Sequence, residues 1–164
     1  MKRSHGFVRL ANRHGRLYRN GMAEVLELDR SECLRLLACH SFGRLAVNVG
    51  GSAPAIRPLN YMFDERSQSI VFCSDYGSKV FGLAIARKAA FEIDGVDPTR
   101  RTGWSVIVVG VAEEILNPPE LRRLQRAGVD SWTPGPKRHW LRIRTQMVTG
   151  RRVVAAAQTV AADQ

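Results

Sequence analysis

Three short stretches decide the fold: Arg57-Pro58-Leu59-Asn60-Tyr61, Phe72-Cys73-Ser74-Asp75-Tyr76-Gly77-Ser78-Lys79 and Trp104-Ser105-Val106-Ile107-Val108-Val109-Gly110. Each mixes polar or aromatic residues with apolar ones, as β-strands do when their two faces meet different surroundings. A Gly-Ser-Lys turn lies between the second strand and the third. The three stretches therefore predict a strand-rich domain with polar groups at the strand ends.

The sequence before these stretches predicts one helix. Asp29 can cap it, and Glu32 follows three residues later, as in a capping box. Cys33, Leu36 and Leu37 then give the helix one apolar stripe. Ahead of it, residues 24–28 alternate weakly and predict a short strand or an extended lead-in.

Further strands are predicted over 43–49, 53–63, 70–73, 89–94 and 104–115, with a final hairpin from 139–145 and 147–154. Gly50-Gly51 marks a hairpin turn after the first of these strands. Pro54 and Pro58 fall in the second strand, which should therefore lie at a sheet edge, be bulged or be opened by a ligand. Short helices are expected over 78–87 and from Pro118.

Most predicted connections are hairpin-sized, and no regular β-α-β alternation occurs. This favours a mostly antiparallel β-barrel with added helices over a doubly wound sheet. The 164 residues suit one domain. We expect a disordered basic arm over 1–22, the barrel over 23–154 and a loose tail over 155–164.

Charge sets the arm apart from the body. Of the net charge of +10, +6 lies in residues 1–22, which contain no acid, and the remaining 19 basic and 15 acidic residues give +4. The arm is expected to add nothing to the fold; the other interpretations are a true start at Met22, a transit peptide, or an arm that touches nucleic acid or anionic lipid. Interleaved aromatic residues and a nucleic-acid-binding motif are lacking, which disfavours a nucleic-acid partner.

The three cysteines have no paired spacing, which favours a reducing compartment. No apolar run reaches the length of a membrane span, and the N-terminus lacks the apolar region of a secretory signal. We therefore expect a cytoplasmic protein with no membrane partner.

Known catalytic and metal motifs are missing from the sequence. The four histidines are scattered without ligand spacing, so no metal is predicted. Neither a hydrolase elbow nor a dinucleotide or Walker loop occurs. What remains is Gly77-Ser78-Lys79 at a strand-to-helix junction, where free backbone N–H groups, a hydroxyl and an ammonium group could hold a phosphate. The alternative is an ordinary helix cap beside a solvated lysine.

Aromatic and cationic side chains are the second indication of a ligand. Trp104, Trp132 and Trp140 fall near predicted loops or strand ends, where they either pack the core or cover a flat heterocycle. Arg142 should share a strand face with Trp140. Arg57, Leu59 and Tyr61 should likewise share one. A flavin needs cations at its phosphate, polar partners at its ring edge and an apolar bed, and the chain offers all three.

Taken in order, these segments resemble the pyridoxamine 5'-phosphate oxidase-like family of flavin mononucleotide (FMN)-binding split barrels, most closely its small actinobacterial members. The similarity runs from about Leu28 to Val153. The motifs that carry it are the helix over 29–37, Gly43-Arg44-Leu45-Ala46, Pro58-Leu59-Asn60-Tyr61, Gly77-Ser78-Lys79, Gly103-Trp104-Ser105-Val106, Trp140-Leu141-Arg142-Ile143 and Thr149-Gly150-Arg151-Arg152. The resemblance implies an antiparallel Greek-key split β-barrel that forms a homodimer, with two cofactor sites at the interface.

The resemblance also implies which residues meet the cofactor. Two strands and the phosphate turn would supply Arg57, Pro58, Leu59, Asn60, Tyr61, Cys73, Ser74, Gly77, Ser78 and Lys79. The partner subunit would supply Ser105 and Trp140 or Arg142. No residue is predicted to be catalytic, because the cofactor itself would carry the hydride chemistry.

Two departures from the family pattern disfavour vitamin B6 oxidation. Met62 stands roughly where true pyridoxamine phosphate oxidases have a lysine, and Arg142-Ile143-Arg144 stands in place of their Arg-x-His. Relatives use FMN, the deazaflavin F420 or haem. We therefore expect an FMN- or F420-dependent oxidoreductase acting on a small molecule; the alternative is a non-enzymatic flavin, F420 or haem binder that serves as a carrier or sensor.

Overall fold

The computed structural model describes residues 16–20, 23–48, 53–74, 88–132, 135 and 138–155. This part of the chain forms nine strands and two helices. The strands are β1 (Arg16–Asn20), β2 (Ala23–Leu28), β3 (Phe42–Val47), β4 (Ala55–Asn60), β5 (Met62–Asp64), β6 (Ser69–Ser74), β7 (Lys88–Asp97), β8 (Thr102–Glu114) and β9 (His139–Ala155). The helices are α1 (Arg30–Cys39) and α3 (Pro118–Ala127).

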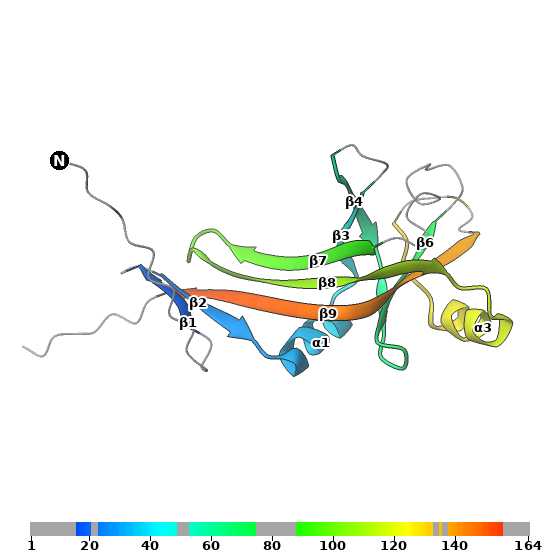
Figure 1. The fold of residues 1–164 in the computed structure, drawn as a ribbon, viewed down its shortest axis with the longest axis horizontal. Helices are drawn as coiled ribbons and strands as arrows, with labels where there is room; N and C mark the ends of the chain where they lie inside the picture. The colour runs from blue at the N-terminus through cyan, green and yellow to red at the C-terminus, as the bar shows by residue number, and fades with distance from the viewer. Residues whose placement is uncertain are drawn as a thin grey trace, which may run out of the picture.

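Three long strands, β7, β8 and β9, run side by side through the centre of the molecule (Figure 1). The sheet follows the order β1-β2-β9-β8-β7-β3-β4, and every pairing is antiparallel. β9 pairs with β6 along its first part and with β2 along its last, and β6 also pairs with β5. The sheet therefore curls into a half-barrel, which confirms the predicted antiparallel split barrel.

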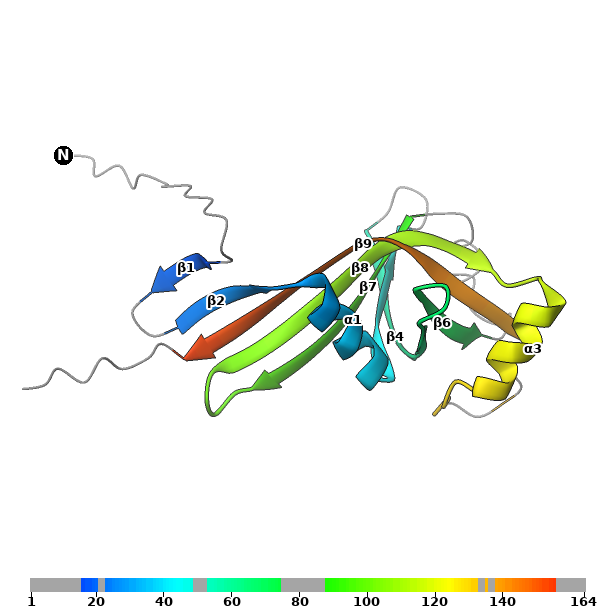
Figure 2. The same ribbon diagram turned by 90° about the horizontal axis from the view of Figure 1, so that it is seen from below.

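Helix α1 lies against one face of this curled sheet (Figure 2). Cys33, Leu36 and Leu37 are buried in the main core, as their spacing predicted. The predicted cap is also present, because Asp29 Oδ1 accepts a hydrogen bond from the Glu32 main-chain N at 2.8 Å. α1 thus packs its apolar stripe into the core of the half-barrel.

The strand interrupted by prolines lies at an edge, as the sequence predicted. β4 contains Pro58 and ends the strand order, with β3 as its only neighbour in the described sheet. The strand breaks at Tyr61, and β5 begins at Met62. The predicted Gly50-Gly51 turn and the predicted helix over 78–87 lie outside the described residues.

The predicted final hairpin is wrong, because β9 is one continuous strand of 17 residues. Thr145 pairs with Gly110 and Met147 with Val109, so Gln146 is an extra residue in a bulge. Gly110 permits the close approach there, since a Cβ at that position would lie 2.0 Å from the Arg144 main-chain O. The sequence around Gln146 contains no glycine, proline or asparagine that would favour a tight turn.

The predicted arm over 1–22 also differs from the structure, because residues 16–20 form β1 and pair with β2. β9 pairs with one edge of β2, and β1 pairs with the other edge. Backbone hydrogen bonding to an open edge needs no apolar periodicity, so the sequence pattern gave no sign of this strand.

Candidate functional site

The β6–β9 ladder brings together residues that lie far apart in the sequence. Cys73 pairs with Trp140, Ser74 with His139 and Val71 with Arg142. Cys73 and Trp140 are partly buried, and Ser74 is buried. The structure therefore places the predicted Cys73, Ser74 and Trp140 at one end of the half-barrel.

Arg142 also lies in this ladder, but two carboxylates occupy its guanidinium group. Nε donates to Glu113 Oε1 at 2.6 Å, and Nη1 donates to Glu120 Oε1 at 2.7 Å. The side chain is only 15% exposed. A cofactor phosphate would have to displace both carboxylates. In this structure Arg142 instead ties β9 to β8 and α3.

Tyr61 belongs to the core. Its side chain is 1% exposed, its hydroxyl donates to the Leu37 main-chain O at 2.9 Å, and its ring packs edge-on against Phe91. Burial raises the pKa of Tyr61 well above its usual range. The predicted shared face of Arg57, Leu59 and Tyr61 therefore does not present Tyr61 to a ligand. Leu59 also packs against the core, and only Arg57 is exposed.

The side-chain amide of Asn60, at the end of β4, is hydrogen-bonded at its oxygen but not at its nitrogen among the described residues. Its Oδ1 accepts a hydrogen bond from the Trp132 main-chain N at 3.0 Å. Its Nδ2 is buried and has no hydrogen-bond partner among the residues that the structure describes. A buried amide N–H without an acceptor is costly, so it marks a place where a ligand acceptor would stabilise the protein. Exposed Arg57 and Pro58 precede it on the same edge strand.

Sequence reasoning missed Phe42, which lies opposite Asn60 in the β3–β4 ladder. The Phe42 and Trp132 rings are nearly parallel, with centroids 5.0 Å apart and an angle of 8° between their planes. The available signal was a large aromatic side chain at position 42, which strand alternation places on the face opposite the buried residues of β3. We call Arg57, Pro58, Asn60, Phe42 and Trp132 the β4 rim.

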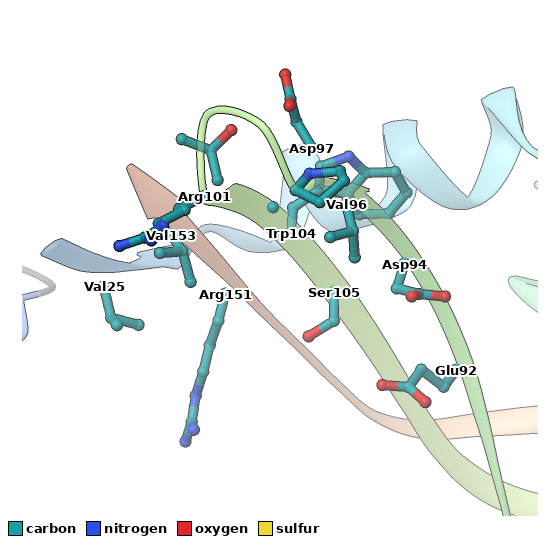
Figure 3. A pocket seen from close by; sticks show the side chains of 13 residues that line it. Val25, Glu92, Asp94, Val96, Asp97, Arg101, Trp104, Ser105, Arg151 and Val153 are labelled. Atoms are coloured by element: carbon teal, nitrogen blue, oxygen red, sulfur yellow. The ribbon is translucent and has the colours of Figure 1, made fainter. Parts of the chain in front are cut away.

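Ser105 lies in a different place, in a groove of about 600 Å³ beside the β7–β8 hairpin (Figure 3). Ile115, ten residues further along, donates its main-chain N to the Trp140 O at 2.8 Å. At about 3.3 Å per residue, Ser105 and Trp140 are roughly 30 Å apart along the strand. Within one chain, the structure therefore separates Ser105 from Trp140. Asp94, which pairs with Ser105, contacts Arg44, the cross-strand neighbour of Pro58.

The groove carries opposite charges on its two sides. Figure 3 shows Glu92 and Asp94 on β7, Arg151 on β9 and Ser105 of β8 between them. Asp94 forms an ion pair with Arg44 of β3. The groove thus offers carboxylates on one side and a guanidinium group on the other to a polar ligand. Trp104 and Val96 line it near the hairpin tip.

Comparison with known proteins identifies the family. The family model for pyridoxamine 5'-phosphate oxidase matches residues 29–152. The chain belongs to the pyridoxamine 5'-phosphate oxidase family. It is 37% identical over 143 residues to an uncharacterised protein of Mycobacterium tuberculosis, covering 83% of this chain and 90% of that protein. The match agrees with the similarity expected over residues 28–153.

Solved structures of similar proteins share the fold. An FAD-binding protein from Mycobacterium smegmatis is 32% identical, with a TM-score of 0.66 over 79% of this chain and 98% of its own. An FAD-binding protein from Mesorhizobium loti is 27% identical, with a TM-score of 0.63 over 78% of this chain and 97% of its own. The chain is therefore a split barrel of the flavin-binding type found in this family.

The hydrogen-bond donors of the β4 rim suit the acceptor groups of a flavin. Among the described residues, the Asn60 amide keeps an N–H without an acceptor that could bind a ring carbonyl or nitrogen, and Arg57 is an exposed cation. Gly77, Ser78 and Lys79, the predicted phosphate turn, lie outside the described residues. Within the described ranges, no three His, Cys, Asp or Glu side chains are grouped as metal ligands. No helix in the described part is long and apolar enough to cross a membrane.

Proposed function

We propose that the chain binds a flavin nucleotide at the β4 rim and uses it to oxidise or reduce a small molecule. The observation that carries the proposal is the buried Asn60 Nδ2, which has no acceptor among the described residues and lies at the end of the edge strand of a flavin-type split barrel. Relatives named as FAD-binding at 32% and 27% identity support the class of cofactor. FMN is the form expected from the sequence.

Each proposed contact uses a group that suits one part of the flavin. Asn60 would donate to an acceptor on the ring edge, while Arg57 and Lys79 would face the phosphate. Cys73, Ser74 and Trp140, which lie together on the β6–β9 ladder, would line another part of the cofactor. The flavin supplies hydride transfer, and the protein orients it and shields it from water.

A second copy of the chain would complete the site. Ser105 is roughly 30 Å from Trp140 along the strand, so a partner subunit would be needed to bring Ser105 to Cys73, Ser74 and Trp140. Exposed apolar side chains on the outer face of β8 and β9, such as Ile107 and Met147, support association through that face. We therefore propose a homodimer with two sites, each built from both subunits.

An absorbance spectrum of the purified protein tests the proposal, because flavin, deazaflavin and haem have distinct bands. Titration with FMN, FAD and F420 then ranks the cofactors. A flavin affinity well above that for F420 is expected, and the absence of flavin binding would overturn the proposal. Turnover of the reduced flavin with added electron acceptors separates an oxidoreductase from the alternative, a carrier or sensor.

Lys79→Ala should weaken flavin binding roughly ten- to a hundredfold, because it removes a charge-assisted hydrogen bond worth about 1.5–3 kcal/mol. Arg100→Ala is the matched control, since Arg100 is an exposed cation at the β7–β8 turn that pairs with Asp97. Equal flavin affinity in the wild type and Lys79→Ala would remove the predicted phosphate turn from the site.

A further inference from the structure

One row of apolar residues crosses five neighbouring strands of the sheet. Each member is the cross-strand partner of the next, and the row runs from β4 to β9 through Ile56, Ala46, Ala90, Val109 and Met147. Cross-strand partners project from the same face, and the adjacent Leu45, Phe91 and Val108 are buried, so the row belongs to the outer face. Its ends are open, since Ile56 is 58% exposed and Met147 is 51% exposed. We call these five residues the apolar row.

Two opposite charges flank the apolar row at equal distances on β7. Lys88 and Glu92 lie two residues before and two residues after Ala90, so they share its face, each about 7 Å from the row. Neither forms an ion pair within the described part of the chain, and Arg44, the cross-strand neighbour of Glu92, is paired with Asp94. A half-turn about the row exchanges the positions of Lys88 and Glu92. The face is therefore complementary to a second copy of itself.

We propose that a second copy of the chain packs on this face with the twofold axis of the dimer running along the apolar row. Lys88 of each copy then pairs with Glu92 of the other, and each apolar residue meets its own equivalent. The inference rests on the proposed function only for the existence of a dimer. It adds the direction of the axis and the two charges that fix it.

This axis also carries Ser105 toward the cofactor site of the other copy. Ser105 and Glu113 lie four residues on either side of Val109 on β8, so Ser105 of one copy faces Glu113 of the other. Glu113 pairs with Arg142, which is two residues from Trp140 on β9. The same axis that matches the charges therefore brings Ser105 to the end of β9 where the proposed dimer needs it.

An axis along β8 is the alternative, and it fits less well. It would bring Asp94 against Arg151, but it would also set two cations, Lys88 and Arg144, against each other, and facing like charges weaken association. Ser105 would then face its own equivalent instead of the far end of the other copy. The charge pattern and the position of Ser105 both favour the axis along the apolar row.

Charge reversal on β7 tests the axis, with sedimentation equilibrium of the full chain as the measurement. Lys88→Glu and Glu92→Lys should each weaken the dimer at least about tenfold, because each sets two pairs of like charges against each other. The double variant should recover the wild-type affinity to within about threefold, and so should an equimolar mixture of the single variants, since both restore opposite charges. Glu65→Lys makes the same charge change in the exposed turn between β5 and β6 and should leave the affinity unchanged.

Three results would overturn the axis: a monomeric wild type, single variants that dimerise normally, or no recovery in the double variant or in the mixture. Titration with FMN, followed by absorbance, separates this inference from the proposed function. Recovery of the dimer without flavin binding upholds the axis and rejects the cofactor. Flavin binding by a dimer that shows no recovery rejects the axis and leaves the cofactor proposal standing.

Discussion

At the scale of single residues, the structure is held by close contacts that leave little spare volume. Gly150 on β9 faces α1, and a Cβ there would lie 2.6 Å from Cys33 Sγ and 3.1 Å from the Leu28 side chain. Glycine is thus required by the packing of α1 on the sheet, and its φ angle is not the reason. Contacts of this kind can be tested by paired substitutions.

Gly150→Ala is expected to lower the free energy of unfolding by about 1–3 kcal/mol, because the added methyl group overpacks the core. Cys33→Ala removes the sulfur that the methyl would meet. The double variant should therefore be more stable than the sum of the single effects predicts, as measured by urea unfolding. Strictly additive losses would show that the two positions do not share this space.

Asp64, paired with Arg123, is the least exposed side chain among the ion pairs in the described part of the chain. Arg123 donates two hydrogen bonds of 2.8 Å to the Asp64 carboxylate, whose side chain is 5% exposed. These hydrogen bonds lower the pKa of Asp64, against the effect of burial. The pair connects α3 to the end of β5.

Because the folded pKa of Asp64 lies below the unfolded value of about 3.9, its contribution is present above that pH. It is lost as the pH falls through the folded pKa. Asp64→Asn should lower stability by about 2 kcal/mol at pH 7, and the difference from wild type should shrink below pH 4. Thermal unfolding at several pH values measures this, with exposed Asp130→Asn as the control. A difference that is the same at pH 7 and pH 3 would rule out the ion pair as its source.

At the scale of elements, prediction from the sequence succeeded where the signal was local. The capped start of α1 and its apolar stripe depend on residues within one or two turns, so Asp29 and Cys33 could be placed correctly. The bulge at Gln146 depends on the pairing of β8 with β9, which no local pattern reports. For the same reason, strand alternation predicted which face Tyr61 and Arg142 share with their neighbours. It could not predict that Tyr61 is buried in the core or that Arg142 is bound by two carboxylates.

Helix α3 is held to the sheet by Arg142, and this gives a test of its predicted cofactor role. Arg142→Met leaves Glu113 and Glu120 without this partner, so stability should fall by about 2 kcal/mol, as measured in urea. Flavin affinity should change less than in Lys79→Ala. Arg144→Met, whose side chain is 63% exposed, is the control and should lose less stability. A large loss of affinity at unchanged stability would restore Arg142 to the cofactor site.

At the scale of the whole molecule, the long strands leave an outer face that α1 does not cover. Ile107 of β8 is 38% exposed and Met147 of β9 is 51% exposed, and both belong to the face opposite the core. A patch of this kind on a sheet is typical of an interface between copies, most often related by a twofold axis. The groove with Ser105 lies on the same strands, so association and cofactor binding should depend on each other.

Ile107→Glu should therefore convert a dimer to a monomer, because it places one charge from each subunit near the twofold contact. Sedimentation velocity at micromolar concentration measures this. Leu116→Glu is the matched control, since Leu116 is 75% exposed and follows β8 beyond this face. If each site takes groups from both subunits, the Ile107→Glu monomer should also bind flavin at least tenfold more weakly, while Leu116→Glu binds it normally. A wild-type monomer would contradict the dimer, and a monomeric variant with unchanged flavin affinity would place the whole site within one chain.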